Sequence, residues 1–90
     1  MSSHYAPSKP LRLNAPTAED GEYLIGFGAV AGDSSLSPSG DLMEAAARLF
    51  DLLHIADASD RPKIAVVPVP ETGLGLAIND RLRRAAAPRG

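Results

Sequence analysis

The chain has 90 residues, no cysteine and a formal net charge of −2. This length allows one small domain with too little core for a deep pocket, and the absence of cysteine excludes disulfides and thiolate metal sites. The charge gives no overall attraction to nucleic acid or to an anionic membrane, and no apolar run approaches the about 20 residues that span a bilayer. Without a secretory signal pattern, a cytoplasmic location is expected.

The first ten residues have the composition of a linker. Pro7 and Pro10 keep the backbone extended, and His4 and Tyr5 precede any predicted strand or helix. Unordered tails are the default for termini, but tyrosine is an uncommon choice for a segment with nothing to pack against. We therefore assign residues 1–10 to the end of a linker and residues 11–90 to a domain.

The first half of the domain is predicted to contain strands. Residues 11–13 suit a short strand, and the mostly apolar run at residues 23–30 suits a strand buried on both faces. The polar residues 14–22 between them are rich in turn formers. Residues 32–40 are predicted as a loop with one brief strand at residues 35–37.

A helix is predicted over residues 41–59, where apolar side chains recur at helical spacing. Asp41 can cap the first turn, with Glu44 three residues later as in a capping box. The stripe expected to be buried comprises Leu42, Met43, Ala46, Leu49, Phe50, Leu53 and Ala56.

A strand at residues 63–70 and a second helix, ended by Pro88, complete the pattern. Pro68 is expected to confine the far end of this strand to an edge or a bulge. Strand, strand, helix, strand and helix in this order predict an α/β domain with an at least partly parallel sheet. The pairing of residues 11–13 stays open, because nine connecting residues are fewer than the about 12 that a parallel crossover usually needs.

Two short motifs have the residue types of a serine hydrolase site. GDSSL at residues 32–36 is followed by Asp51-x-x-His54, and such catalysis needs a hydroxyl, an imidazole base and a carboxylate. Asp51 and His54 lie three apart on one predicted helix, however, which is the wrong spacing. His54 is better interpreted as a residue at the helix edge.

The TGLG motif at residues 72–75 leads into the second helix and could cradle a phosphate on free backbone amides. No Lys-Ser/Thr follows the last glycine, so the Walker pattern is absent. Glu71 also stands where an anion would approach. A tight strand-to-helix turn is the favoured interpretation.

Three arginines, Arg81, Arg83 and Arg84, could contact nucleic acid. Basic residues near a helix C-terminus are favourable in any case, and no aromatic residues stand between these arginines. Direct binding of nucleic acid is therefore not expected.

Three segments together resemble the C-terminal domain of the long-form L-threonylcarbamoyladenylate synthases, which are YrdC-like enzymes. They are SSHYAPSKPLRL at the start, LSPSGDLMEAAARLF in the middle and GLGLAINDRLRRAAAPR at the end. The resemblance covers almost the whole chain and implies a small, Rossmann-like, three-layer α/β fold. In this family a YrdC-like catalytic domain comes first, then a linker that ends in His-Tyr-(Ala/Ser)-Pro. The chain is therefore expected to be a fragment of such an enzyme.

The resemblance implies a function for the whole enzyme and a smaller one for this domain. The full enzymes join L-threonine, bicarbonate and ATP into threonylcarbamoyladenylate, release pyrophosphate, and so serve threonylcarbamoyladenosine modification of tRNA. Catalysis, ATP and Mg²⁺ would belong to the YrdC-like domain, which would be the partner of this chain. The chain alone would be noncatalytic, with no cofactor or metal site of its own.

By the same resemblance, Tyr5 with His4 and Pro7 would help to close the active site around ATP or the adenylate. The α/β domain would anchor the far end of this lid. One departure is that longer members carry a helix between their first two strands, for which residues 14–22 are too few. The alternative from another class is an independent small module that binds a nucleotide or a protein.

Overall fold

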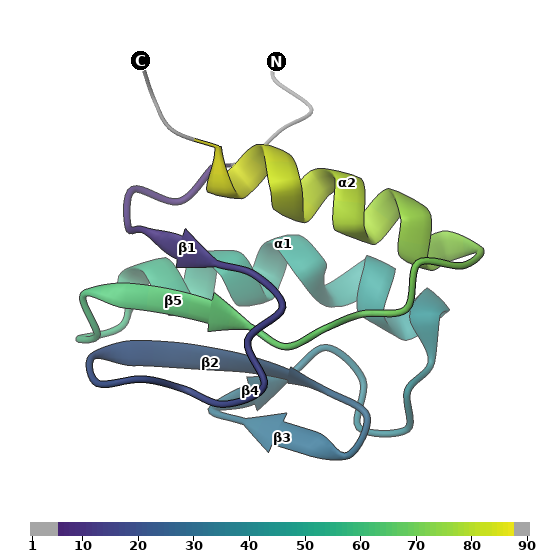
Figure 1. Cartoon of the computed structure of the whole chain (residues 1–90), viewed down its shortest axis with the longest axis horizontal. Coiled ribbons are helices and arrows are strands. Elements are labelled where there is room, and N and C mark those ends of the chain that lie inside the picture. Colours follow the sequence, from purple (N-terminus) through teal and green to yellow (C-terminus); the bar gives the residue numbers. More distant parts are fainter. Residues whose placement is uncertain (1–5, 88–90) are drawn as a thin grey trace.

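The computed structural model describes residues 6–87. Five short strands form one sheet in the order β1-β5-β2-β3, with β4 also paired to β2, and two helices pack on it (Figure 1). The pairs of β5 with β1 and β2, and of β4 with β2, are parallel, whereas β3 is antiparallel to β2. The predicted α/β class with an at least partly parallel sheet is confirmed, and three of the four strand pairs are parallel. The elements are β1 Leu11–Arg12, β2 Glu22–Phe27, β3 Val30–Gly32, β4 Ser34–Ser35, α1 Leu42–Ala58, β5 Lys63–Val66 and α2 Leu74–Ala86.

The last strand in the chain, β5, lies in the middle of the sheet. Its residue Ile64 is aligned with Leu11 of β1 on one side and with Tyr23 of β2 on the other. The strand predicted at residues 63–70 ends at Val66, so the expectation that Pro68 confines its far end to an edge or a bulge is wrong, because the proline follows the strand. This topology also settles the pairing of β1, whose connection to β2 crosses over β5.

The apolar run at residues 23–30 is not one strand, as predicted, but a strand and a tight hairpin turn. β2 ends at Phe27, which is aligned with Val30 of β3. Gly28 turns the chain with a φ of +62°, a conformation that residues with a Cβ atom rarely adopt. Gly28 therefore marks a change of chain direction inside the apolar run.

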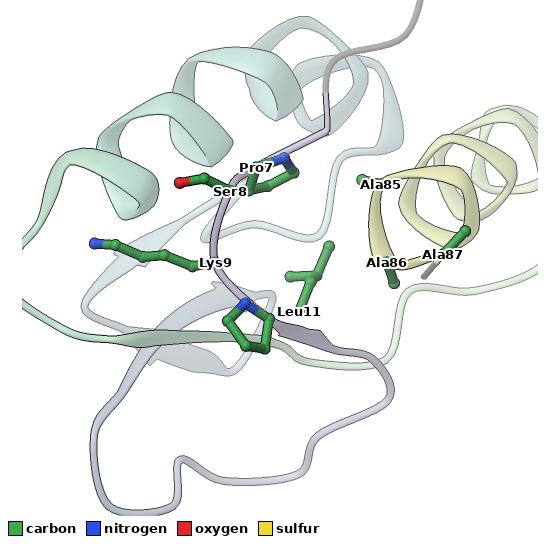
Figure 2. A pocket seen from close by; sticks show the side chains of 8 residues that line it. Pro7, Ser8, Lys9, Leu11, Ala85, Ala86 and Ala87 are labelled. Carbon is green, nitrogen blue, oxygen red and sulfur yellow. The ribbon is translucent and has the colours of Figure 1, made fainter. Parts of the chain in front are cut away.

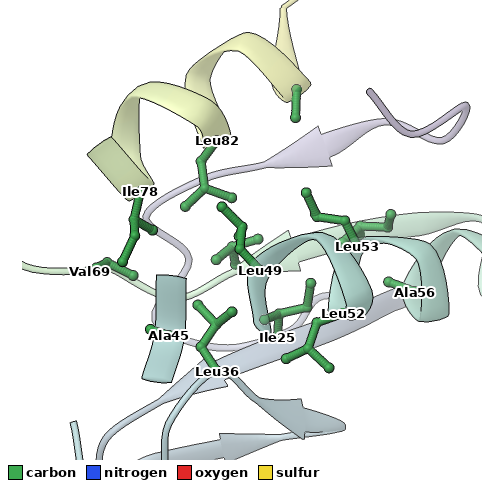
Figure 3. Close-up of a cluster of buried hydrophobic side chains, with 13 residues drawn as sticks. Ile25, Leu36, Ala45, Leu49, Leu52, Leu53, Ala56, Val69, Ile78 and Leu82 are labelled. Atoms are coloured by element: carbon green, nitrogen blue, oxygen red, sulfur yellow. The ribbon is translucent and has the colours of Figure 1, made fainter. Parts of the chain in front are cut away.

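Both helices lie on the same face of the sheet, and one apolar core fills the space between them (Figure 3). In Figure 1, α1 lies behind the sheet, while the segment that joins β1 to β2 passes in front of it. On this face the layer is formed by the loop at residues 13–21 and contains no helix, as the shortness of residues 14–22 predicts. A smaller cluster lies under this loop: Ala15, Leu24, Ala65 and Val67.

The first helix begins as predicted, with Asp41 accepting a hydrogen bond from the Met43 amide at 2.9 Å. The reciprocal bond of the expected capping box comes from Ser37 instead of Glu44, since the Asp41 amide donates to Ser37 Oγ at 2.9 Å. The buried face is also rotated from the prediction, because α1 packs against both the sheet and α2. Met43 is 71% exposed. The buried residues are Ala45, Leu49, Leu52, Leu53 and Ala56.

A buried carboxylate ties β1, the connecting loop and β2 together. Glu22 is 4% exposed and accepts two hydrogen bonds from the Arg12 guanidinium, at 2.9 and 2.8 Å. The Glu19 amide donates a third, at 2.7 Å. The bond from Arg12 is the main reason why the pKa of Glu22 falls to about 2, against burial, which acts to raise it.

Candidate functional site

The end of the predicted linker is fastened to the last turn of α1. The backbone amide and the hydroxyl of Ser8 donate to the Asp57 carboxylate at 3.2 and 3.0 Å, and the Lys9 amide donates to it at 3.3 Å. A carboxylate that accepts several hydrogen bonds holds its donors more firmly than a neutral acceptor does. These bonds fix the backbone at two successive linker residues.

Lys9 makes a second attachment through its side chain. Its ammonium group donates to the backbone oxygens of Ala56 at 3.3 Å and Ser59 at 2.7 Å. The C-terminus of a helix carries unpaired carbonyls and a partial negative charge, and the last turn of α1 has no basic residue of its own. A cation from the linker therefore caps a helix that is distant in sequence.

Pro7 and Pro10 complete the attachment on either side of these two residues. Pro7 is buried, and the Pro10 carbonyl accepts a hydrogen bond from the Ile64 amide at 2.9 Å, which leads the chain into β1. We call residues 7–10, with the last turn of α1, the linker attachment site. His4 and Tyr5, the other two predicted lid residues, lie outside the described residues.

A groove of about 400 Å³ runs between the linker attachment site and the last turn of α2. Figure 2 shows Leu11 lying between the linker backbone and α2, while the Ser8 and Lys9 side chains point away toward α1. The residues that line the groove are apolar or small, apart from Ser8 and Lys9. The lining residues are Pro7, Ser8, Lys9, Pro10, Leu11, Ala85, Ala86 and Ala87.

Asp33 and His54 of the hydrolase-like motifs form hydrogen bonds within the domain. Asp33 accepts hydrogen bonds from the Leu24 amide at 2.8 Å and from Arg61, and the backbone bond is the main reason why its pKa is lowered. His54 is exposed on α1, where its Nδ1 lies 2.7 Å from the Phe50 carbonyl. This placement agrees with a histidine at the helix edge.

The TGLG motif forms a tight turn into α2, as the sequence predicts. Gly73 precedes α2 with a φ of +53°, and a Cβ atom at Gly75 would overlap with the Pro70 carbonyl oxygen. Asn79 secures this approach by donating to the Val69 and Gly75 carbonyls, both at 2.9 Å. The close packing of the turn speaks against a phosphate cradle here.

Two of the three arginines are paired with carboxylates. Arg83 lies 3.2 Å from Glu71, and Arg84 lies 3.0 Å from Asp80. Arg81 lines a second, smaller groove between the two helices. Within residues 6–87, no group of three or more His, Cys, Asp or Glu side chains is arranged to hold a metal ion. Neither helix of that range has the length and apolar character needed to cross a membrane.

Comparison with known proteins gives one match. The family model described as the C-terminal domain of threonylcarbamoyl-AMP synthase matches residues 1–87. No curated protein and no solved structure matches the chain.

Proposed function

The chain belongs to the family of threonylcarbamoyl-AMP synthase C-terminal domains, and from this we propose that it anchors a lid over the active site of a YrdC-like catalytic domain. The catalytic domain would bind ATP with Mg²⁺ and join threonine, bicarbonate and the adenylyl group. This chain would contribute no reacting group. The observation that carries the proposal is the attachment of Ser8 and Lys9 to α1, because Ser8 follows the predicted lid residue Tyr5 by only three positions.

An anchored lid has a physical advantage over a free one. A segment held at one end explores a smaller volume, so its effective concentration at the cavity is raised and less entropy is lost on closure. Closure excludes water, which suits a carbamoyl-adenylate because it is prone to hydrolysis. In this proposal His4 and Tyr5 close the cavity, and Pro7, which is buried in the domain, holds them in position.

The described residues favour a noncatalytic role for the chain. Binding a triphosphate needs several converging cations or amide donors, whereas Arg83, Arg84 and Arg12 each pair with a carboxylate of the domain. Within residues 6–87, no three or more His, Cys, Asp or Glu side chains are grouped as a metal ion would need. We therefore place ATP and Mg²⁺ in the catalytic domain.

Replacing Tyr5 by alanine in the full synthase tests the lid. The change removes an aromatic contact that exists only in the closed state, so synthesis of the adenylate should slow by about tenfold, equivalent to about 1.4 kcal/mol. Pyrophosphate release with ATP, threonine and bicarbonate measures this rate. The same change in the isolated chain should leave its unfolding midpoint unaltered. Undiminished turnover would remove Tyr5 from the lid, and loss of stability would place it in the core of the domain.

Asp57→Ala in the full synthase tests the anchor. The change frees the backbone amides of Ser8 and Lys9, so the closed lid should be less populated and turnover should fall by about three- to tenfold. Asp51→Ala, at an exposed position on the same helix, is the matched control and should leave turnover unchanged. Equal activity of the two variants would mean that the attachment seen here has no part in closure.

A further inference from the structure

The two described ends of the chain lie at the same end of the domain (Figure 1). The N-terminal end leads into the linker attachment site, and the C-terminal end follows the last turn of α2. The groove of about 400 Å³ lies between them. At the opposite end of the domain, the largest exposed apolar side chains include Met43 on α1, 71% exposed, and Leu76 on α2, 55% exposed. Exposure alone would select that opposite end as an interface.

The short length of chain between the lid and its anchor favours an interface at the end of the domain that holds the linker attachment site. Ser8 is fixed to Asp57, and Tyr5 precedes it by three residues. Since a chain spans at most about 3.6 Å per residue, the Cα atoms of Tyr5 and Ser8 are separated by no more than about 11 Å. A lid residue on so short a tether reaches only a cavity whose mouth lies next to the attachment site.

The opposite end is too far away to meet that requirement. Met43 precedes Asp57 by 14 residues on one helix, and the rise of about 1.5 Å per residue separates them by about 21 Å. A catalytic domain seated over Met43 and Leu76 would hold its cavity well beyond the reach of Tyr5.

We propose that the catalytic domain docks on the end of this domain formed by the linker attachment site and the last turn of α2. This inference rests on the proposed lid function. The surface offered there is a groove lined on one side by small residues at the end of α2, Ala85 to Ala87, and on the other by residues that include Pro7 and Leu11. Such a surface fits an apolar ridge of the partner, because small residues let two backbones approach closely and exclude water.

Cysteine labelling tests the surface, since the chain contains no cysteine. Ala87→Cys places a thiol at an exposed position on the groove, and Met43→Cys places one at the exposed opposite end. Each variant is labelled with a maleimide in the isolated chain and in the full synthase with ATP and threonine, and the labelled peptide is identified by mass spectrometry. In the synthase, position 87 should react at least about tenfold more slowly than in the isolated chain, and position 43 should react at about the same rate in both.

The labelling results distinguish the proposed docking surface from the proposed lid role of Tyr5. Protection of position 87 in the synthase supports the docking surface, whatever Tyr5→Ala does to turnover. Free reaction of position 87 overturns it, even if Tyr5→Ala slows synthesis and the lid therefore stands. Protection of position 43 instead would place the catalytic domain at the opposite end. Slow reaction of position 87 in concentrated isolated chain would assign the groove to a second copy and would equally overturn the proposal.

Discussion

Gly75→Ala should destabilise the domain by about 3–5 kcal/mol, although a change from glycine to alanine inside a helix ordinarily stabilises by about 1 kcal/mol. The new Cβ atom would overlap with the Pro70 carbonyl oxygen, which belongs to the backbone and cannot rotate away. Moving the two apart also breaks the bonds by which Asn79 joins the Val69 and Gly75 carbonyls. A domain of this length has roughly 5–13 kcal/mol of stability in total, so the variant should be largely unfolded under mild denaturation.

Urea unfolding followed by circular dichroism measures this loss, with Gly73→Ala as the matched control. Gly73 has a φ of +53° but open space around its Cα atom, so alanine there adds backbone strain alone, about 1–2 kcal/mol. The difference between the two variants therefore reports the close approach of α2 to the chain before it. If both variants lost the same free energy of unfolding, or if Gly75→Ala gained stability, the segment before α2 would be able to move away from the new Cβ atom without loss of stability.

Glu22→Gln should lower the free energy of unfolding at pH 7 by about 2–3 kcal/mol. The change keeps the size of a side chain that is 4% exposed but weakens its bonds to the Arg12 guanidinium and forces an amide group against donors. Glu71→Gln is the matched control, because Glu71 forms an exposed ion pair with Arg83. Exposed pairs contribute about 0–1 kcal/mol, so equivalent losses in the two variants would contradict a structural role for the buried carboxylate.

The same carboxylate predicts how stability depends on pH. Folding lowers the pKa of Glu22 from 4.5 to about 2, so the unfolded chain takes up the proton first as the pH falls. The stability that Glu22 contributes is then complete above pH 4.5 and is lost progressively toward pH 2. Unfolding in urea at pH 7 and at pH 3 should show a smaller loss for Glu22→Gln than for the unchanged chain. The lowered pKa of Asp33 leaves the variant some acid sensitivity of its own.

Helices were the elements best predicted from the sequence. Both predicted helices are present, and the predicted Asp41 cap of the first is confirmed. These features depend on residues close together in sequence, which is why pattern alone suffices. The face of α1 that is buried depends instead on where α2 and the sheet lie, and there the prediction was rotated.

The sheet was predicted less well, because its pairing depends on distant residues. Residues 23–30 were predicted as one strand, and Pro68 was expected to limit the far end of another. In the structure Gly28 begins a hairpin turn after β2, and Pro68 follows a central strand that has already ended. Residues 14–22 are too few for a helix between the first two strands. In the structure a loop covers that face of the sheet instead.

The family and the lid hypothesis came from resemblance, and the family is confirmed. The anchor itself was not predicted. A signal was present, however, since Asp57 near the C-terminus of α1 opposes the helix dipole and no basic residue stands in that turn. A helix C-terminus with an additional carboxylate is stabilised by hydrogen-bond donors or cations from other parts of the chain. Only the fold shows that Ser8 and Lys9 supply them.

The central position of β5 has a consequence for the order of folding. β1 and β2 are both aligned with β5, so a chain synthesised only as far as residue 62 can pair β2 with β3 and β4 but lacks the strand that joins β1 to β2. Contacts between residues so distant in sequence form slowly, because a long loop must close first. The Pro10 carbonyl is held by the Ile64 amide of that same strand. The linker attachment is therefore complete only after β5 has formed, although its bonds to α1 do not need that strand. Amide exchange at Ile64 should report the cooperative opening of the whole unit.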